Sequence, residues 1–470
     1  MLNKTKNMLL DRLLNYHEEN ADLFREGQHN SVALIRQEAL STLRKIGLPN
    51  NKDEKWRSTN LTTIYEQDFA FNKTAVDYSK SLDEIFVCEV HGFDTQTVSM
   101  LNGWYYSPNN VKLNIHENGL IVGSILEAQK QFPELFNKHF NTVVKKDTHG
   151  LIAANTALFH DGLFIYVPDG VIVKKAIQLI KMINRDDNLM VNSRNLIILG
   201  KNSQLSFLHC DDSINHGSSF NNTVTEVIIS ENAHFNLYKL QNLNDSTSLV
   251  NSTFIKQERN SSSKVNVITY NGGLIRNELY VDLVGEGADA DLNGVYLMDK
   301  KQHIDNQVFV NHAVPNCTSS ELFKGVLDDE SSGVFSGYIY VARDAQNTQA
   351  FQQNNNILFS SKAKIDTQPF LEIYADDVKC SHGATVGQLD NEALFYMKQR
   401  GISNEDARLL LMFAFTAEVT AKIGIESLRQ TIEDMIKKRL RGELSICDKC
   451  VLHCSVPDIP MEFDIDMSKI

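Results

Sequence analysis

The middle of the chain, from about residue 80 to residue 378, is one short apolar run after another, and strong helical periods are mostly absent. Turn-forming Asn, Ser, Asp and Gly separate the runs, which include 119–122, 163–167 and 196–199. This pattern is typical of short β-strands joined by turns. The stretch 124–136 is an exception and fits one short helix. The chain must therefore fold around a large β-structure.

A weak internal repeat bears on the kind of β-structure. The segments 202–207 (NSQLSF), 232–237 (NAHFNL) and 287–292 (GADADL) each begin with a turn residue, continue with a small residue and then alternate with period two. Their starts are 30 and 55 residues apart, so the period is not fixed. Coils of a β-solenoid with insertions would give this pattern. A large β-sandwich, whose turns also favour Asn and Gly, is the alternative.

Both flanks of the strand region have helical periodicity. Residues 4–47 predict two helices. After residue 388, Asp390 can cap a helix, Ser403 can cap a second, and a third runs to about Leu440. The second of these helices is nearly all apolar over 409–415, so we expect most of its circumference to be buried.

Charge and composition exclude several classes of protein. The chain has 59 acidic and 46 basic side chains, and a formal net charge of −13 argues against a nucleic-acid binder. The longest apolar stretch, 409–415, is far shorter than a membrane span, and the apolar run 8–10 is too short for a signal-peptide core. The seven cysteines are an odd number, and four stand alone, unlike a secreted disulfide framework. We expect a cytoplasmic protein that binds neither nucleic acid nor membrane.

The motifs of common enzymes are absent or have a simpler explanation. The segment 285–290 (GEGADA) fits G-x-G-x-x-A, but a strand-like segment follows it, and a dinucleotide site needs a helix there. We therefore predict a turn. No P-loop, G-x-S-x-G or H-E-x-x-H sequence occurs. No residue is assigned a catalytic role.

Cys380 and His382 form the first candidate site. They are two positions apart, so in an extended chain their side chains face the same side. A thiolate and an imidazole together suit a soft metal such as iron, or sulfur chemistry. The alternative is a buried cysteine and a hydrogen-bonded histidine at the junction of two domains.

Cys447, Cys450 and Cys454 form a second candidate site near the end of the chain. Three thiolates can hold zinc or an iron–sulfur cluster if a fourth ligand arrives. No second C-x-x-C pair is present, and the alternative is a loose tail with redox-sensitive thiols.

Many short segments in order, from about Trp56 to Leu440, resemble the SufB/SufD family of iron–sulfur cluster assembly proteins. They include 101–103 (LNG), 272–277 (GGLIRN), 301–305 (KQHID) and 376–387. The resemblance implies a mainly β fold, a right-handed parallel β-helix core flanked by N- and C-terminal α-helical domains. The expected division is an N-terminal helical domain at 1–79, the β-helix at 80–388, a C-terminal helical domain at 389–442 and a cysteine-containing tail at 443–470.

Two positions favour the SufD branch of that family over the SufB branch. Chains of the SufB type carry a cysteine at the position of Asn354 and a glutamate at the position of Gly383, directly after the histidine that matches His382. The resemblance also implies that His382 corresponds to the SufD histidine implicated in cluster assembly at the SufB interface. His382, with Cys380, is therefore the candidate cluster-assembly site.

The resemblance implies a non-catalytic scaffold subunit in a complex of the SufBCD type. Its partners would be a SufB-like paralogue, paired as a heterodimer, and a SufC-like ATPase docked on the C-terminal helices. The chain alone would hold no stable cofactor: a cluster would form transiently at the SufB interface, and a flavin could belong to the complex. An isolated chain could form a homodimer. The alternatives are a SufB-like homodimeric scaffold and a β-helix enzyme that acts on carbohydrates.

Overall fold

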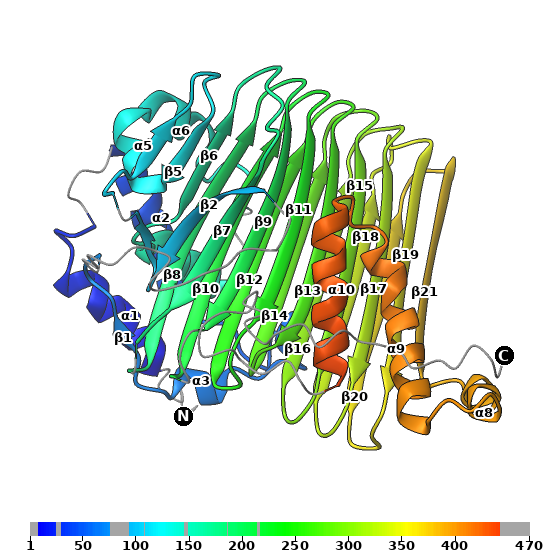
Figure 1. Ribbon diagram of the computed structural model, residues 1–470. Helices are drawn as coiled ribbons and strands as arrows, with labels where there is room; N and C mark the ends of the chain where they lie inside the picture. Colours follow the sequence, from blue (N-terminus) through cyan, green and yellow to red (C-terminus); the bar gives the residue numbers. More distant parts are fainter. Residues whose placement is uncertain are drawn as a thin grey trace.

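A computed structural model describes residues 8–24, 30–75, 94–107, 109–144, 149–185, 187–213 and 217–441 of the chain. These residues form a parallel β-solenoid of about 7 turns flanked by helices at both ends of the chain (Figure 1). The predicted β-helix is therefore confirmed, and the alternative of a β-sandwich is wrong. Strand after strand pairs in parallel with the strand one coil away, which a sandwich built from hairpins would not do.

The described strands form two sheets, and successive strands of the coil alternate between them. The first sheet contains, in chain order, β1 (Ala70–Phe71), β4 (Leu113–Ile115), β5 (Ile121–Ser124), β6 (Leu163–Val167), β8 (Leu189–Leu199), β10 (Ser219–Ile229), β12 (Thr247–Gln257), β14 (Leu274–Leu283), β16 (His303–His312), β18 (Ser332–Val341) and β20 (Lys364–Ile373). The second contains β2 (Thr95–Leu101), β3 (Trp104–Tyr106), β7 (Ala176–Ile183), β9 (Gln204–Ser213), β11 (His234–Asn242), β13 (Ser262–Asn271), β15 (Asp289–Met298), β17 (Thr318–Leu327), β19 (Thr348–Leu358) and β21 (Val378–Gly387).

The two ends of this stack differ. At the N-terminal end, β4 pairs with β5 and β3 pairs with β2 in antiparallel fashion, so each sheet finishes in a hairpin-like pair. At the C-terminal end, β20 and β21 are the last strands of their sheets, and no further described strand pairs with them. The last coil therefore presents two open parallel edges.

The repeat in the sequence is the corner of a coil. Asn202 and Asn232 both have a positive φ, of 55° and 58°, and the Asn232 amide donates to Oδ1 of Asn202 one coil below at 3.1 Å. Asparagine tolerates this left-handed conformation better than most residues. The small residue that follows, Ser203 or Ala233, is buried where the chain enters the next strand. Gly287, with a φ of 75°, takes the same place in the segment 285–290, which is the predicted turn.

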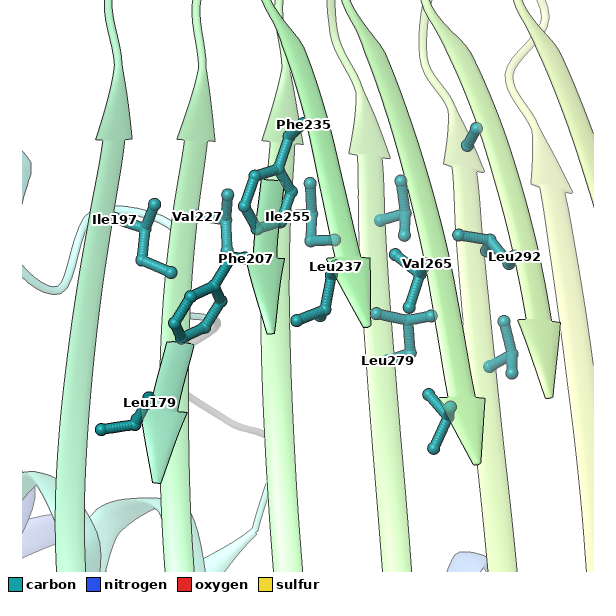
Figure 2. Packing of buried hydrophobic residues seen from close by; sticks show 14 of the residues in the cluster. Leu179, Ile197, Phe207, Val227, Phe235, Leu237, Ile255, Val265, Leu279 and Leu292 are labelled. Atoms are coloured by element: carbon teal, nitrogen blue, oxygen red, sulfur yellow. The ribbon is translucent and has the colours of Figure 1, made fainter. Parts of the chain in front are cut away.

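The space between the sheets has an apolar zone and a polar zone. In the apolar zone, aliphatic and aromatic side chains from both sheets meet, among them Ile197, Phe207, Val227 and Leu237 (Figure 2). The polar zone lies further along the same strands, where Lys181 donates to Thr223 at 2.6 Å and Gln241 donates to Asn277 at 2.9 Å across the interior. Buried polar groups need such partners, so this zone fixes the register of the coils.

The helices are α1 (Met8–Glu19), α2 (Asn30–Ile46), α3 (Thr62–Tyr65), α5 (Ile125–Gln131), α6 (Pro133–His139), α7 (Gly150–Leu158), α8 (Asn391–Gln399), α9 (Asn404–Thr420) and α10 (Glu426–Leu440), with a 3-10 turn η1 (Glu54–Trp56). The single helix expected over 124–136 is wrong: α5 and α6 are separate helices. Phe132 lies between them with an extended φ of −131°, because Pro133 disfavours the helical conformation in the residue before it. None of the described helices has the length and apolar character to cross a membrane.

The C-terminal helices cover the outer face of the second sheet (Figure 1). Met412 and Val419 of α9, with Leu428 and Ile432 of α10, pack against apolar side chains of β11, β13, β15 and β17. The expected burial of 409–415 is wrong for this chain: of these seven residues only Met412 is buried, and Ala414 is exposed. One side of α9 therefore remains open to solvent.

Candidate functional site

Cys380 and His382 lie on β21, the last strand of the second sheet, and share one face of it. Their Cα partners on β19 are Ala350 and Gln352, both buried between the sheets. Because paired residues of neighbouring parallel strands point the same way, Cys380 and His382 belong to the inner row of the β-helix. This inner row ends at the open end of the stack, where His382 is exposed.

The two side chains have different surroundings. Cys380 is half-buried and packs against a small apolar cluster that includes Ile339 and Ala350. Burial raises the pKa of the Cys380 thiol, and a hydrogen bond from the backbone of Ala350 lowers it in part. The thiol is therefore protonated at neutral pH and is not a ready nucleophile. His382, by contrast, is exposed to solvent.

This pair does not complete a metal site. Among the residues that the structure describes, no three His, Cys, Asp or Glu side chains gather where they could hold a metal ion. Cys380 and His382 can supply a sulfur and a nitrogen donor, and an iron–sulfur cluster needs about four such donors. Any further ligands would have to come from outside the described residues of this chain. Cys447, Cys450 and Cys454 lie outside the described residues.

Two residues that the sequence did not indicate lie directly behind His382. Gln352 is 3% exposed, and its Nε2 atom donates to Oε2 of Glu321 on β17 at 2.7 Å. Burial raises the pKa of Glu321 to about 8, which the hydrogen bond from Gln352 only partly offsets. The sequence does contain a sign of Glu321, because an acidic residue two positions before Phe323 falls on the inner row of a strand. Only the register of the coils, however, relates Glu321 to His382.

Asn354, the position at which SufB-type chains carry a cysteine, also points into the interior. Its amide donates to the Tyr296 hydroxyl at 3.0 Å and to the carbonyl of Phe323 at 3.1 Å, and the Tyr296 hydroxyl donates to Asn356. The amide group of Asn354 is thus engaged in hydrogen bonds inside the core. Asn354 is thus a structural residue here and offers no thiol to the interior.

Comparisons with known proteins point to one family. A family model described as "SUF system FeS cluster assembly, SufBD core domain" matches residues 182–415, and a "SufBD protein N-terminal region" matches residues 8–179. The chain is 27% identical to the iron–sulfur cluster assembly protein SufD of Escherichia coli, over 86% of this chain and 92% of that protein. It is 26% identical to SufD of Bacillus subtilis, over 92% of this chain and 100% of that protein. A SufBD family protein of Synechocystis is 28% identical over 86% of this chain and 90% of its own length.

Proposed function

This chain belongs to the SufB/SufD family and is similar to SufD, and on that premise we propose that it is a non-catalytic scaffold subunit in iron–sulfur cluster assembly. It would pair with a SufB-like paralogue and dock a SufC-like ATPase. The observation that carries the proposal is the position of His382, exposed on the inner row at the open end of the β-helix. A partner that joins this end would meet the imidazole directly.

The proposed role of His382 follows from its chemistry. The cluster is cargo that is built and released, so the site should bind it transiently. An imidazole can ligate iron or transfer a proton to or from sulfide near neutral pH. Cys380 would have a role secondary to that of His382, because its raised pKa keeps the thiol protonated until a metal or a base removes the proton. A flavin held in the assembled complex could carry electrons for the reaction.

The proposed SufC docking surface lies on the C-terminal helices. Phe395 and Tyr396 of α8 are 65% and 60% exposed, and α8 has no buried residue. On α9, Leu410 and Leu411 are only half-buried. Exposed aromatic and aliphatic side chains on adjacent helices are typical of an interaction surface. This supports docking of the ATPase at α8 and the open side of α9.

The test is a His382→Ala variant of the full-length chain, assembled with its SufB-like and SufC-like partners. We expect the complex to form, because one side chain at a large interface rarely decides association. The rate of cluster formation, followed by iron and sulfide content, should fall by at least about 10-fold, as is common when a metal site loses one group. His234→Ala is the matched control, since His234 is also exposed but lies at a coil corner on β11. A His382→Ala complex that builds clusters at the wild-type rate would refute the proposed role.

A further inference from the structure

Three side chains form a column that runs from the interior of the β-helix to its open end. Glu321 on β17, Gln352 on β19 and His382 on β21 are successive Cα partners across three parallel strands. Neighbouring strands lie about 4.8 Å apart, so each side chain is in reach of the next. Glu321 and Gln352 are 2% and 3% exposed, whereas His382 is exposed. The register therefore places a buried acid two strands behind the proposed functional histidine.

Hydrogen bonding orients the middle member of the column. Nε2 of Gln352 donates to Oε2 of Glu321, and Oε1 of Gln352 has no partner among the described residues. Leaving a buried carbonyl oxygen without a donor is unfavourable. The amide nitrogen is turned toward β17, which leaves the amide oxygen for a donor on the side of β21. His382 is the inner-row residue of β21 at that position.

The fold leaves space for this amide. On the opposite sheet, a Cβ atom at Gly337 of β18 would lie 1.9 Å from Nε2 of Gln352 and 2.9 Å from its Oε1. Any larger residue at position 337 would displace the amide. The absence of a side chain there is thus a requirement of the column.

The buried end of the column is neutral at pH 7. The raised pKa of Glu321, about 8, results from its burial, and its register neighbour on β15 is the apolar Leu292. A protonated carboxyl is far cheaper to bury than a carboxylate, and it still accepts the hydrogen bond from Gln352. The column therefore orients an amide without placing a negative charge behind the histidine.

We infer that Gln352, oriented by Glu321, is a positioning residue for His382: when the imidazole turns toward β19, the unpartnered Oε1 of Gln352 accepts a hydrogen bond from one ring nitrogen and thereby leaves the other ring nitrogen with its lone pair directed to the open end. This inference rests on the proposed function of His382. In histidines that ligate metals, the hydrogen bond of one ring nitrogen fixes which nitrogen is free to bind. Gln352 would do the same for a nitrogen that binds iron or accepts a proton.

The test is the tautomer of His382, read from the ring nitrogen resonances of the full-length chain labelled with 15N-histidine. The His382→Ala variant assigns its signals among the 14 histidines. At a pH where the ring is neutral, we expect one tautomer in the wild type and a mixture in Gln352→Met, which keeps the length of the side chain but removes the amide. Glu321→Gln retains an acceptor for Gln352 and should match the wild type. Gln353→Met is the control, because Gln353 is the exposed neighbour on the same strand.

Cluster formation gives a second readout, and we expect the Gln352→Met complex to be slower by about 10- to 100-fold. The same tautomer mixture in the wild type and in Gln352→Met would overturn the inference. If Gln352→Met fails to fold, Glu321→Met leaves Gln352 in place but removes the group that orients it, and it should show the mixed tautomer. If the tautomer changes in Gln352→Met but the His382→Ala complex forms clusters at the wild-type rate, the inference about Gln352 is supported and the proposed function of His382 is refuted. The inference and the proposed function can therefore fail separately.

Discussion

At the scale of single residues, the interior of the β-helix shifts the pKa values of two buried acids, Asp211 and Glu321, in opposite directions. Asp211 lies between Lys181 and Lys239, each 3.3 Å from one of its oxygens. Burial by itself would raise the pKa of Asp211, but Lys239, His209 and Lys181 together hold it well below its ordinary value. Among the described residues, Glu321 has one polar partner, the neutral Gln352, and burial raises its pKa. The sign of each shift thus depends on whether the neighbouring coil supplies a cation.

We predict that Glu321 makes the stability of the protein depend on pH. Its folded pKa of about 8 lies above the ordinary value of 4.5, so the native state binds more protons between these two values. Its contribution is complete below about pH 4.5 and is lost as the pH rises through 8, with a limiting slope of about 1.4 kcal/mol per pH unit. Glu321→Gln cannot ionise and should lack this component. Urea unfolding from pH 5 to about pH 8.5 measures it, and a wild-type-minus-variant difference that is constant over this range would contradict the assignment.

Part of the candidate site could be predicted from the sequence, and part could not. Cys380 and His382 are two residues apart, so the period of a strand was sufficient to place them on one face. Glu321 and Gln352 are 31 residues apart, and their contact depends on how many residues each coil contains. Coil length varies along this chain, and no local pattern reveals it. Gln352 therefore became visible only in the structure.

At the scale of the elements, the helix starts were predictable and the partner of α9 was not. The Asp390 side chain accepts from the backbone of Glu392 and Ala393, and the Ser403 side chain accepts from the backbone of Asp406, as their positions in the sequence indicated. Capping is a local interaction, so a local pattern predicts it. The run 409–415 was expected to be buried, but burial depends on the surface that it meets. Within this chain that surface covers only one side of the helix.

We predict that the double variant Phe395→Ser, Tyr396→Ser weakens the binding of the cognate SufC-like ATPase by at least about 10-fold, because exposed aromatic residues often dominate an interface. Substitution is preferable to deletion of the helices, since α9 and α10 cover apolar residues of the second sheet. Calorimetric titration measures the Kd. Leu34→Ser is the control, at a residue of α2 that is 60% exposed. Unchanged affinity would place the ATPase elsewhere.

At the scale of the whole molecule, the fold is a stack whose two ends are built differently. The N-terminal end finishes in antiparallel pairs, and the C-terminal end exposes β20 and β21. Unpaired parallel edges are ready templates for another chain. Val386, on the inner row of β21, is 48% exposed at this end.

We therefore predict that Val386→Glu weakens pairing with a SufB-like partner by at least about 10-fold, because the interface would bury a charge without a counterion. Sedimentation velocity over a range of concentrations measures the pairing. Val111→Glu is the control, since Val111 is 47% exposed and precedes β4 at the N-terminal end of the stack. Equal weakening by both variants would show that charge in general, and not this end, is responsible.

The difference between the ends also determines how large an assembly can become. If chains were to assemble end to end, each would bring one end that its own antiparallel pairs close and one end to which a further coil could be added. Two chains that meet head to head at their open ends would terminate each other, and growth would stop at two. A head-to-tail contact would continue into a fibre, but the edge strands at the other end, β3 and β4, have three residues each and offer only a short edge to receive it. The chain can thus expose strand edges for pairing and still avoid open-ended polymerisation.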